Sequence, residues 1–345
     1  MSYYAIIFDP ETPFQDKMLL VCLTPTLTGL FVMEIHFFFN EKKYRKVINW
    51  VKKLYQQQKY EEAFGCKFDF TEIAVVIWKV FKYLMILQVV CFIFFMISPI
   101  LLPIENAMPI LLPYTDNDPF YEHCLNFIYQ NWIAFNFSIV MFGYIMLYAI
   151  FTGHLIAQTH FLHDILHKIG EIEETNYKKK LIENYVGDKK SQKLMENIVL
   201  LHNEIMSVTN QTFELYSLGT LIWEFAMILI HGVNFTMFQL YPAGMGPTFL
   251  GGIVLTSQYF LMSFISTRVQ DSYSGISDAI YNSKWYAMNT SNKKTVLQVI
   301  QMAQNAKVMT VGGFGEANLE RFVDALNTTR KICILIGVTT QVAKT

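Results

Sequence analysis

The positive charges of this chain lie in alternate connections between its long apolar segments, and this alternation restricts the topology that the chain can adopt. Lysine and arginine are concentrated in three connections, at residues 42–53, 168–193 and 268–321. The two connections between them differ, because residues 101–130 contain no Lys or Arg and residues 232–247 carry almost no charge. Basic connections stay in the cytoplasm. The sequence therefore predicts a membrane protein with several spans, whose last segment ends outside the cell.

The composition agrees with this class of protein. Of the 345 residues, 53% are hydrophobic and 16% are charged, which is too apolar for an ordinary soluble domain. The net charge of -1 leaves no continuous basic face, so a nucleic-acid partner is not expected. The five cysteines are scattered, and their spacing indicates neither a metal site nor a disulfide framework. We therefore expect an all-α bundle of membrane helices without a metal or a cofactor.

The number of spans follows from the length of the apolar segments. A helix needs about 20 apolar residues to cross the hydrocarbon core. Five candidate spans and a shorter sixth are Met18–Phe39, Val75–Pro99, Trp132–Ile156, Leu215–Gly232, Phe249–Ile265 and Ile332–Val342. Six spans that end outside would also begin outside, yet the leading residues have no signal sequence. We therefore expect one span to be missing or short at the front, and seven spans in the complete protein, with a cytoplasmic N-terminus and an extracellular C-terminus.

Amphipathic segments flank these spans. Residues 190–214 and 278–307 place apolar residues three and four apart, the second with a turn at 289–292. This spacing predicts helices that continue into the cytoplasm and could form an intracellular base. The glycine cluster at 312–315 is expected to be a flexible break between two helices. The segment 318–342 is also helical by its periodicity, but it carries Glu320, Asp324, Arg330 and Lys331. Charges at membrane depth must face protein or water, so we interpret this last helix as the lining of an aqueous path.

Short motifs in the last third of the chain resemble those of one known family. Residues 280–286 read Ile-Tyr-Asn-Ser-Lys-Trp-Tyr, residues 309–314 read Met-Thr-Val-Gly-Gly-Phe, and residues 318–322 read Asn-Leu-Glu-Arg-Phe. Their order and spacing resemble the tail of the insect odorant receptor family, which has a Tyr-x-x-x-Trp element, a Thr-Ala-Gly-x-Phe-like turn and a Leu-x-x-Phe helix start. One departure is at residues 329–333, where Thr-Arg-Lys-Ile-Cys stands in place of the family's aromatic element.

The resemblance implies an odorant-gated, non-selective cation channel of the plasma membrane, and not an enzyme. Members of the family are expected to assemble as tetramers with a shared odorant co-receptor, so co-receptor subunits and membrane lipid are the implied partners. Each subunit contributes its last helix to a central pore, and the variable subunit binds a small volatile apolar odorant in its outer half. The chain then divides into three parts: a transmembrane bundle at 1–270, a cytoplasmic helical anchor at 271–315 and a pore-lining helix at 316–345.

Two alternatives belong to other functional classes. A gustatory-type receptor would share the fold, but its usual Thr-Tyr…Gln-Phe ending is not matched by residues 336–341. A transporter or membrane enzyme needs a charged or metal-ligating cluster at mid-membrane, and the candidates Glu34, Lys79 and Glu224 lie on different spans. His160, His163 and His167 have the spacing of a metal-binding helix face, but the remaining histidines are isolated, so no metal site is predicted.

The outer ends of the spans supply aromatic and methionine side chains around few polar groups, which suits a volatile apolar ligand. The candidate ligand-binding residues are Leu27, Phe31, Phe92, Phe95, Met96, Phe135, Ile139, Phe142, Phe249, Ile253 and Ser257. The alternative for each of them is that it packs against a neighbouring helix or lipid, as most aromatic side chains in membrane helices do.

One face of the last helix carries the candidate pore residues, at spacings of three, four and seven. Apolar rings close a pore by dewetting, and an amide near the outer mouth contacts hydrated cations without binding them tightly. The candidates are Ile334, Gly337, Val338 and Gln341. For Gly337 the alternative is that it permits close packing of two helices.

The charge pattern generates a prediction about topology. An epitope tag added after Thr345 should be labelled on intact cells, because the last segment ends outside. A tag inserted near Lys180 should be labelled only after permeabilisation, since that connection is basic. Immunofluorescence on the same cells measures both, and the opposite result would indicate the topology of a G-protein-coupled receptor.

Overall fold

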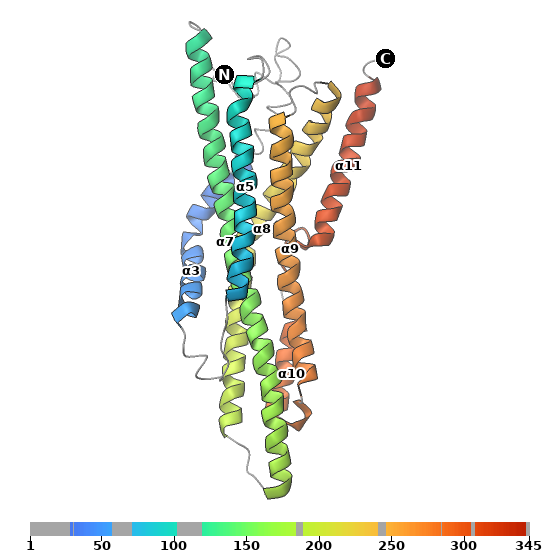
Figure 1. Cartoon of the computed structure of the whole chain (residues 1–345). Helices are drawn as coiled ribbons and strands as arrows, with labels where there is room; N and C mark the ends of the chain where they lie inside the picture. Colours follow the sequence, from blue (N-terminus) through green and yellow to red (C-terminus); the bar gives the residue numbers. More distant parts are fainter. Residues whose placement is uncertain are drawn as a thin grey trace.

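The computed structural model describes residues 28–29, 31–56, 71–101, 119–183, 189–240, 246–283, 285–304 and 308–342. These residues are almost entirely helical, as predicted, and the one bridge of β type among them joins Thr310 to Glu316. Helical residues 31–39 precede the first named helix. The elements are α3 (Glu41–Gln56), α5 (Thr71–Leu101), α7 (Pro119–Glu183), α8 (Lys189–Leu240), α9 (Gly246–Asn282), the short 3-10 helix η2 (Trp285–Ala287), α10 (Thr290–Gln304) and α11 (Leu319–Val342). Figure 1 shows them as an elongated bundle.

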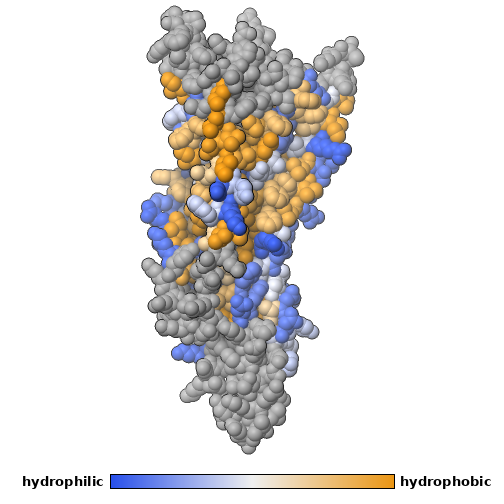
Figure 2. Space-filling model, in the orientation of Figure 1, coloured by the Kyte–Doolittle hydropathy of each residue, from blue (hydrophilic) through white to orange (hydrophobic). Residues whose placement is uncertain are grey.

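Four of the described helices are long and apolar enough to cross a membrane. The stretches with this property are Ala74–Ile93, Ser138–Leu166, Met195–Thr236 and Phe249–Asn282. Each overlaps a span that the sequence predicts. Figure 2 shows apolar side chains gathering on the upper half of the molecule, while hydrophilic side chains are frequent below them. The exposed apolar surface of the upper half is therefore suited to contact with lipid.

The helices α7 and α8 are much longer than a bilayer requires. They contain 65 and 52 residues, and at about 1.5 Å per residue α7 is roughly 100 Å long, against about 30 Å for the hydrocarbon core. The amphipathic segment predicted at 190–214 continues directly into the following span within α8, as expected. The second amphipathic segment is interrupted slightly before the turn predicted at 289–292, because α9 ends at Asn282 and α10 begins at Thr290. The Asn289 side chain accepts a hydrogen bond from the Asn292 backbone N–H and caps α10.

A buried column of aromatic side chains holds α7 against α8. The rings of Tyr144 and Trp223 stack at a centroid distance of 5.2 Å, and Tyr216 lies 4.6 Å from Tyr144 and 4.9 Å from Tyr148. On the other side of the column, Tyr44 of α3 packs edge-on against Tyr216 at 5.9 Å. All five side chains are buried. Aromatic pairs of this kind stabilise a core beyond the burial of their area, so this column forms the centre of the bundle.

Polar side chains connect four helices at membrane depth. Gln88 of α5 donates to the Ser138 hydroxyl of α7 at 2.8 Å, and its carbonyl oxygen accepts from Gln258 of α9 at 3.4 Å. The Gln258 carbonyl oxygen in turn accepts from the indole N–H of Trp223 on α8 at 3.2 Å. Because these groups bind one another, none has to be solvated by hydrocarbon. These directional bonds therefore help to fix how α5, α7, α8 and α9 are oriented relative to one another.

The glycine turn between α10 and α11 is attached to the bundle. Gly312 and Gly313 have φ values of 58° and 87°, the region that favours glycine, and they separate the two helices as predicted. The Gly312 backbone N–H donates to the Ser217 carbonyl of α8 at 3.0 Å, and the hydroxyls of Ser217 and Thr310 lie 3.0 Å apart. The sequence indicated a flexible break, whereas the structure shows a turn with defined hydrogen bonds to α8.

The aromatic column generates a prediction about stability. A Cβ atom on Gly219 of α8 would overlap the phenol oxygen of Tyr144, so Gly219→Ala should displace that ring. The expected cost is roughly 1–3 kcal/mol, as for other overpacked cores. A lower midpoint in the thermal unfolding of the detergent-solubilised protein measures it.

Gly143→Ala is the matched control on the facing helix, because no atom of another described helix lies within 4 Å of the Cβ position there. Equal midpoints for the two variants would mean that Gly219 is not required for the close approach of Tyr144 to α8.

Candidate ligand-binding cleft

A cleft of about 760 Å³ lies between α8, α9 and α11. Ligand pockets in proteins usually have volumes of about 300–1,000 Å³, so its size suits a small molecule. Its walls are mostly aromatic and aliphatic. The lining residues are His231, Asn234, Phe235 and Phe238 of α8, Phe249, Ile253, Thr256, Ser257 and Phe260 of α9, and Phe322, Leu326, Thr329, Arg330 and Cys333 of α11.

Each wall is one face of a single helix. The lining positions of α8 are 231, 234, 235 and 238, and those of α9 and α11 recur at the same intervals of three and four. These intervals place side chains above one another on a helix surface. Among the described residues, the cleft is therefore formed by three largely apolar stripes that the helices present to one another.

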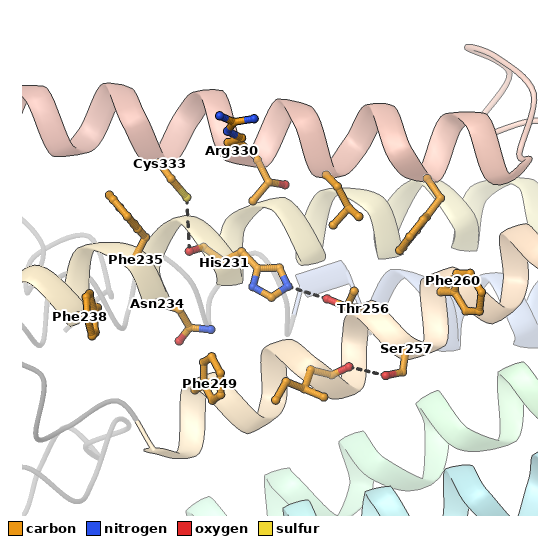
Figure 3. Close-up of a pocket in the computed structure, with 14 residues that line it drawn as sticks. His231, Asn234, Phe235, Phe238, Phe249, Thr256, Ser257, Phe260, Arg330 and Cys333 are labelled. Carbon is orange, nitrogen blue, oxygen red and sulfur yellow. Dashed lines mark hydrogen bonds between the residues drawn. The ribbon is translucent and has the colours of Figure 1, made fainter.

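Several polar side chains of the cleft form hydrogen bonds with other groups of the protein. His231 Nε2 and the Thr256 hydroxyl oxygen are 2.6 Å apart across α8 and α9. The Thr256 hydroxyl also donates to the Gly252 carbonyl at 2.8 Å, and the Ser257 hydroxyl donates to the Ile253 carbonyl at 2.8 Å. In Figure 3 the phenylalanine side chains lie around this polar pair, and the Arg330 head group points away from it. A bound molecule would thus meet chiefly apolar surface, with the His231 and Thr256 pair as a local polar contact.

The two ends of α11 close the cleft in different ways. Near its start, Phe322 packs between Phe260 and Tyr259 of α9, with ring centroids 5.4 and 5.7 Å away. Farther along, α11 approaches α8 closely at Gly337, where a Cβ would lie 3.4 Å from the Phe235 ring and 3.2 Å from the Gln239 amide nitrogen. The cleft lies between these two contacts.

The structure divides the predicted ligand-binding residues between separate regions. Phe249, Ile253 and Ser257 lie together in the cleft. On α5 and α7, Phe92 faces Phe135 at a centroid distance of 6.0 Å, and Phe142 faces Phe81 at 5.1 Å. Exposed positions on the outer surface hold the side chains of Phe31, Phe135 and Ile139. Leu27 lies outside the described residues, as do the side chains of Phe95 and Met96.

Sequence reasoning missed the α8 wall of the cleft. The predicted span ended at Gly232, but α8 continues to Leu240. His231 lies just before the predicted end, and Asn234, Phe235 and Phe238 lie beyond it. Their spacing of three, four and seven was the available signal for a helix face. The α11 wall was also missed, because the sequence assigned that helix to the pore and gave no sign of which face meets α8.

The predicted pore residues do not all lie on the same side of α11. Ile334 and Val338 are each 54% exposed and point away from the bundle. Gly337 is instead placed against Phe235 of α8, which matches the alternative of close helix packing. The side chain of Gln341 lies outside the described part of the chain.

Comparison with known proteins places this architecture in a family of receptors. The sequence model of the family described as 7tm Odorant receptor matches residues 17–330. The chain therefore belongs to the seven-transmembrane odorant receptor family. No curated protein matched it.

Solved structures with the same fold include the insect olfactory receptor OR5 from Machilis hrabei. In its complex with eugenol, that receptor is 15% identical to this chain with a TM-score of 0.78, and the match covers 98% of this chain and 85% of the other. A second structure of OR5 gives 16% identity and a TM-score of 0.76, and the match covers 97% of this chain and 84% of the other. At these identities the likeness shows the fold alone.

Proposed function

We propose that this chain is the odorant-binding subunit of a ligand-gated, non-selective cation channel in the plasma membrane, assembled with the odorant co-receptor. The observation that carries the proposal is the position of α11. One face of this helix forms a wall of a cleft of ligand size, and its other face exposes both apolar and charged side chains. A ligand in the cleft would contact the same helix that borders the ion path.

The proposed ligand is a small, mainly apolar odorant. Its proposed contacts are Phe249, Ile253 and Ser257 from the sequence prediction, together with the α8 and α11 walls of the cleft. Aromatic walls provide contact area without strict geometry, and the His231 and Thr256 pair can orient one polar group of the ligand. The family relative OR5 was solved in complex with eugenol. The aromatic region around Phe92 and Phe135 remains a second proposed site for the odorant.

The proposed ion path runs along the exposed face of α11. Asp324 and Lys331 are exposed there, and Arg330 is exposed at the border with the cleft. Charges on a membrane helix need water or an opposite charge. Farther along, Ile334 and Val338 provide the apolar ring that can close a pore, with Gln341 proposed at the outer mouth. Gly337 does not line the proposed path, because it faces α8 and permits the close packing of α11 on α8.

Current recordings test this function. Cells that express this chain with the odorant co-receptor should show cation currents in response to part of an odorant panel, and this chain alone should give none. Ligand-evoked current from this chain alone would contradict its assignment as a dependent tuning subunit.

The same recordings locate the odorant. Phe249→Ala removes an aromatic wall of the cleft and should raise the half-maximal odorant concentration by about tenfold, which corresponds to about 1.4 kcal/mol of lost apolar contact. Phe135→Ala, which removes an aromatic side chain of similar exposure from α7, is the matched comparison. A shift with Phe135→Ala and none with Phe249→Ala, at equal surface expression, would move the site to the α5 and α7 region.

Cysteine modification tests the ion path. In a background with Cys333→Ser, cysteines at Ile334 and Val338 should react with a charged thiol reagent more rapidly when odorant is present, because these exposed positions would border the open path. A cysteine at Ala325, which is buried against the bundle, should react slowly in both states. Equal, odorant-independent rates at all three positions would remove α11 from the pore wall.

A further inference from the structure

A carboxylate is buried inside the bundle at membrane depth. Glu224 lies on α8 within the stretch Met195–Thr236 that is apolar enough to span a membrane, and its side chain is 9% exposed. An isolated carboxylate in this position is costly, because neither hydrocarbon nor aromatic side chains solvate it. An ionised Glu224 therefore needs hydrogen-bond donors or a positive charge beside it.

The partners of Glu224 come from the two other helices that form the cleft. The Tyr259 hydroxyl of α9 donates to Glu224 Oε2 at 2.7 Å. Arg321, in the first turn of α11, donates from Nε to Oε2 at 3.0 Å and places Nη2 2.8 Å from Oε1. The contact of Arg321 is bidentate, the geometry that gives arginine and carboxylate pairs their strength and direction. One side chain on α8 thus binds both α9 and the start of α11.

Other hydrogen bonds hold the start of α11 at the same place. The Leu319 backbone N–H donates to the Thr267 hydroxyl of α9 at 3.1 Å. The Asn318 side chain accepts from the Arg321 backbone N–H at 2.8 Å and caps the helix. The preceding glycine turn is bound to α8 at Ser217. The first turn of α11 is therefore attached by directional bonds on two sides.

Farther along α11, the contacts with α8 change in kind. A Cβ on Gly232 would lie 3.9 Å from Ile332, and the Cys333 sulfur lies 3.8 Å from the His231 carbonyl oxygen. These are van der Waals contacts and a weak thiol hydrogen bond, which a tilt of the helix can exchange at low cost. Figure 1 shows α11 beginning beside α9 and diverging from it toward the C-terminus.

The cleft touches this attachment directly. Phe322, which lines the cleft, is the neighbour of Arg321 in sequence and packs on the Tyr259 ring at 5.7 Å. A molecule that presses on Phe322 therefore acts beside the ion pair. Because directional bonds fix the start of α11, a force in the cleft would turn the helix about that start.

We propose that Glu224, Tyr259 and Arg321 form the pivot of α11, and that this pivot converts occupancy of the cleft into a tilt of the helix. The inference rests on the proposed function, because it concerns how the same site is coupled to the ion path. Glu224 acts here as a positioning residue: it touches neither the ligand nor the ions, but fixes the point about which α11 turns.

The experiment weakens the pivot without removing its charges. Arg321→Lys keeps the cation and loses the bidentate contact, and Tyr259→Phe keeps the ring and loses one hydrogen bond. Both variants are expressed with the odorant co-receptor and compared for surface delivery, maximal odorant-evoked current per channel at the surface, and the rise in unfolding temperature that the same odorant gives the purified complex. Arg45→Lys is the matched control, because Arg45 pairs with Glu41 on the exposed surface of α3.

For Arg321→Lys we expect a fall in maximal current of at least about fivefold, in the range of ordinary coupling between sites, with surface delivery and the ligand-induced rise in unfolding temperature retained. Tyr259→Phe should give a smaller fall of the same kind, and Arg45→Lys should give none. The exchange variant Glu224→Arg with Arg321→Glu should recover current that either single reversal abolishes.

Two results would overturn the pivot. Full maximal current in both Arg321→Lys and Tyr259→Phe would show that the ion pair is not needed for coupling. Loss of the ligand-induced rise in unfolding temperature together with the current would show that the cluster only maintains the cleft. If Arg321→Lys does not reach the surface, Tyr259→Phe decides by the same two criteria. Failure of the proposed function can be told apart from failure of the pivot, because in the first case the unaltered chain would also give no odorant-evoked current.

Discussion

Charged side chains on α11 must meet either water or an opposite charge, because hydrocarbon solvates neither sign. This constraint determines how the last third of the chain is arranged. Arg321 meets Glu224 at 2.8 Å inside the bundle, whereas Asp324, Arg330 and Lys331 lie on exposed positions. The helix therefore has one face that belongs to the protein and one that needs an aqueous surrounding. The cleft forms mainly on the first face, with Arg330 at its border, so ligand and ions would meet different sides of one helix.

The fold was largely predictable, because length and hydropathy identify a membrane helix without any knowledge of its neighbours. The four long apolar helices were all predicted, and only their ends were misplaced. Pro119 begins α7 within a stretch that was read as a connection, since Glu122 and His123 lower the local hydropathy without interrupting the helix. Proline at the first position of a helix was the missed signal. The domain boundary predicted at residue 270 falls inside the continuous helix α9.

The candidate site was predictable only in part, since a site between three helices depends on which faces meet. Phe249, Ile253 and Ser257 were predicted because they begin a span at its expected outer end, and they line the cleft. The periodicity of α11 places Ile334, Gly337 and Val338 near one another, but it cannot show that Gly337 is directed to Phe235 while the other two are exposed. Glu224 was noted as an unusual charge on its span. Its partner Arg321 is 97 residues away in sequence, and no local pattern connects the two.

The uninterrupted length of α7 and α8 has a mechanical consequence. A long helix without a break bends only gently, so α7 and α8 are suited to support the shorter elements packed on them. In the part of the chain that the structure describes, the interruptions after α9 lie at η2 and at the glycine turn before α11. The long helices α7 and α8 thus form a support, and α11 is attached to it after the glycine turn. In the proposed function, work done by a ligand in the cleft would act mainly on α11, and α7 and α8 would provide the support against which it moves.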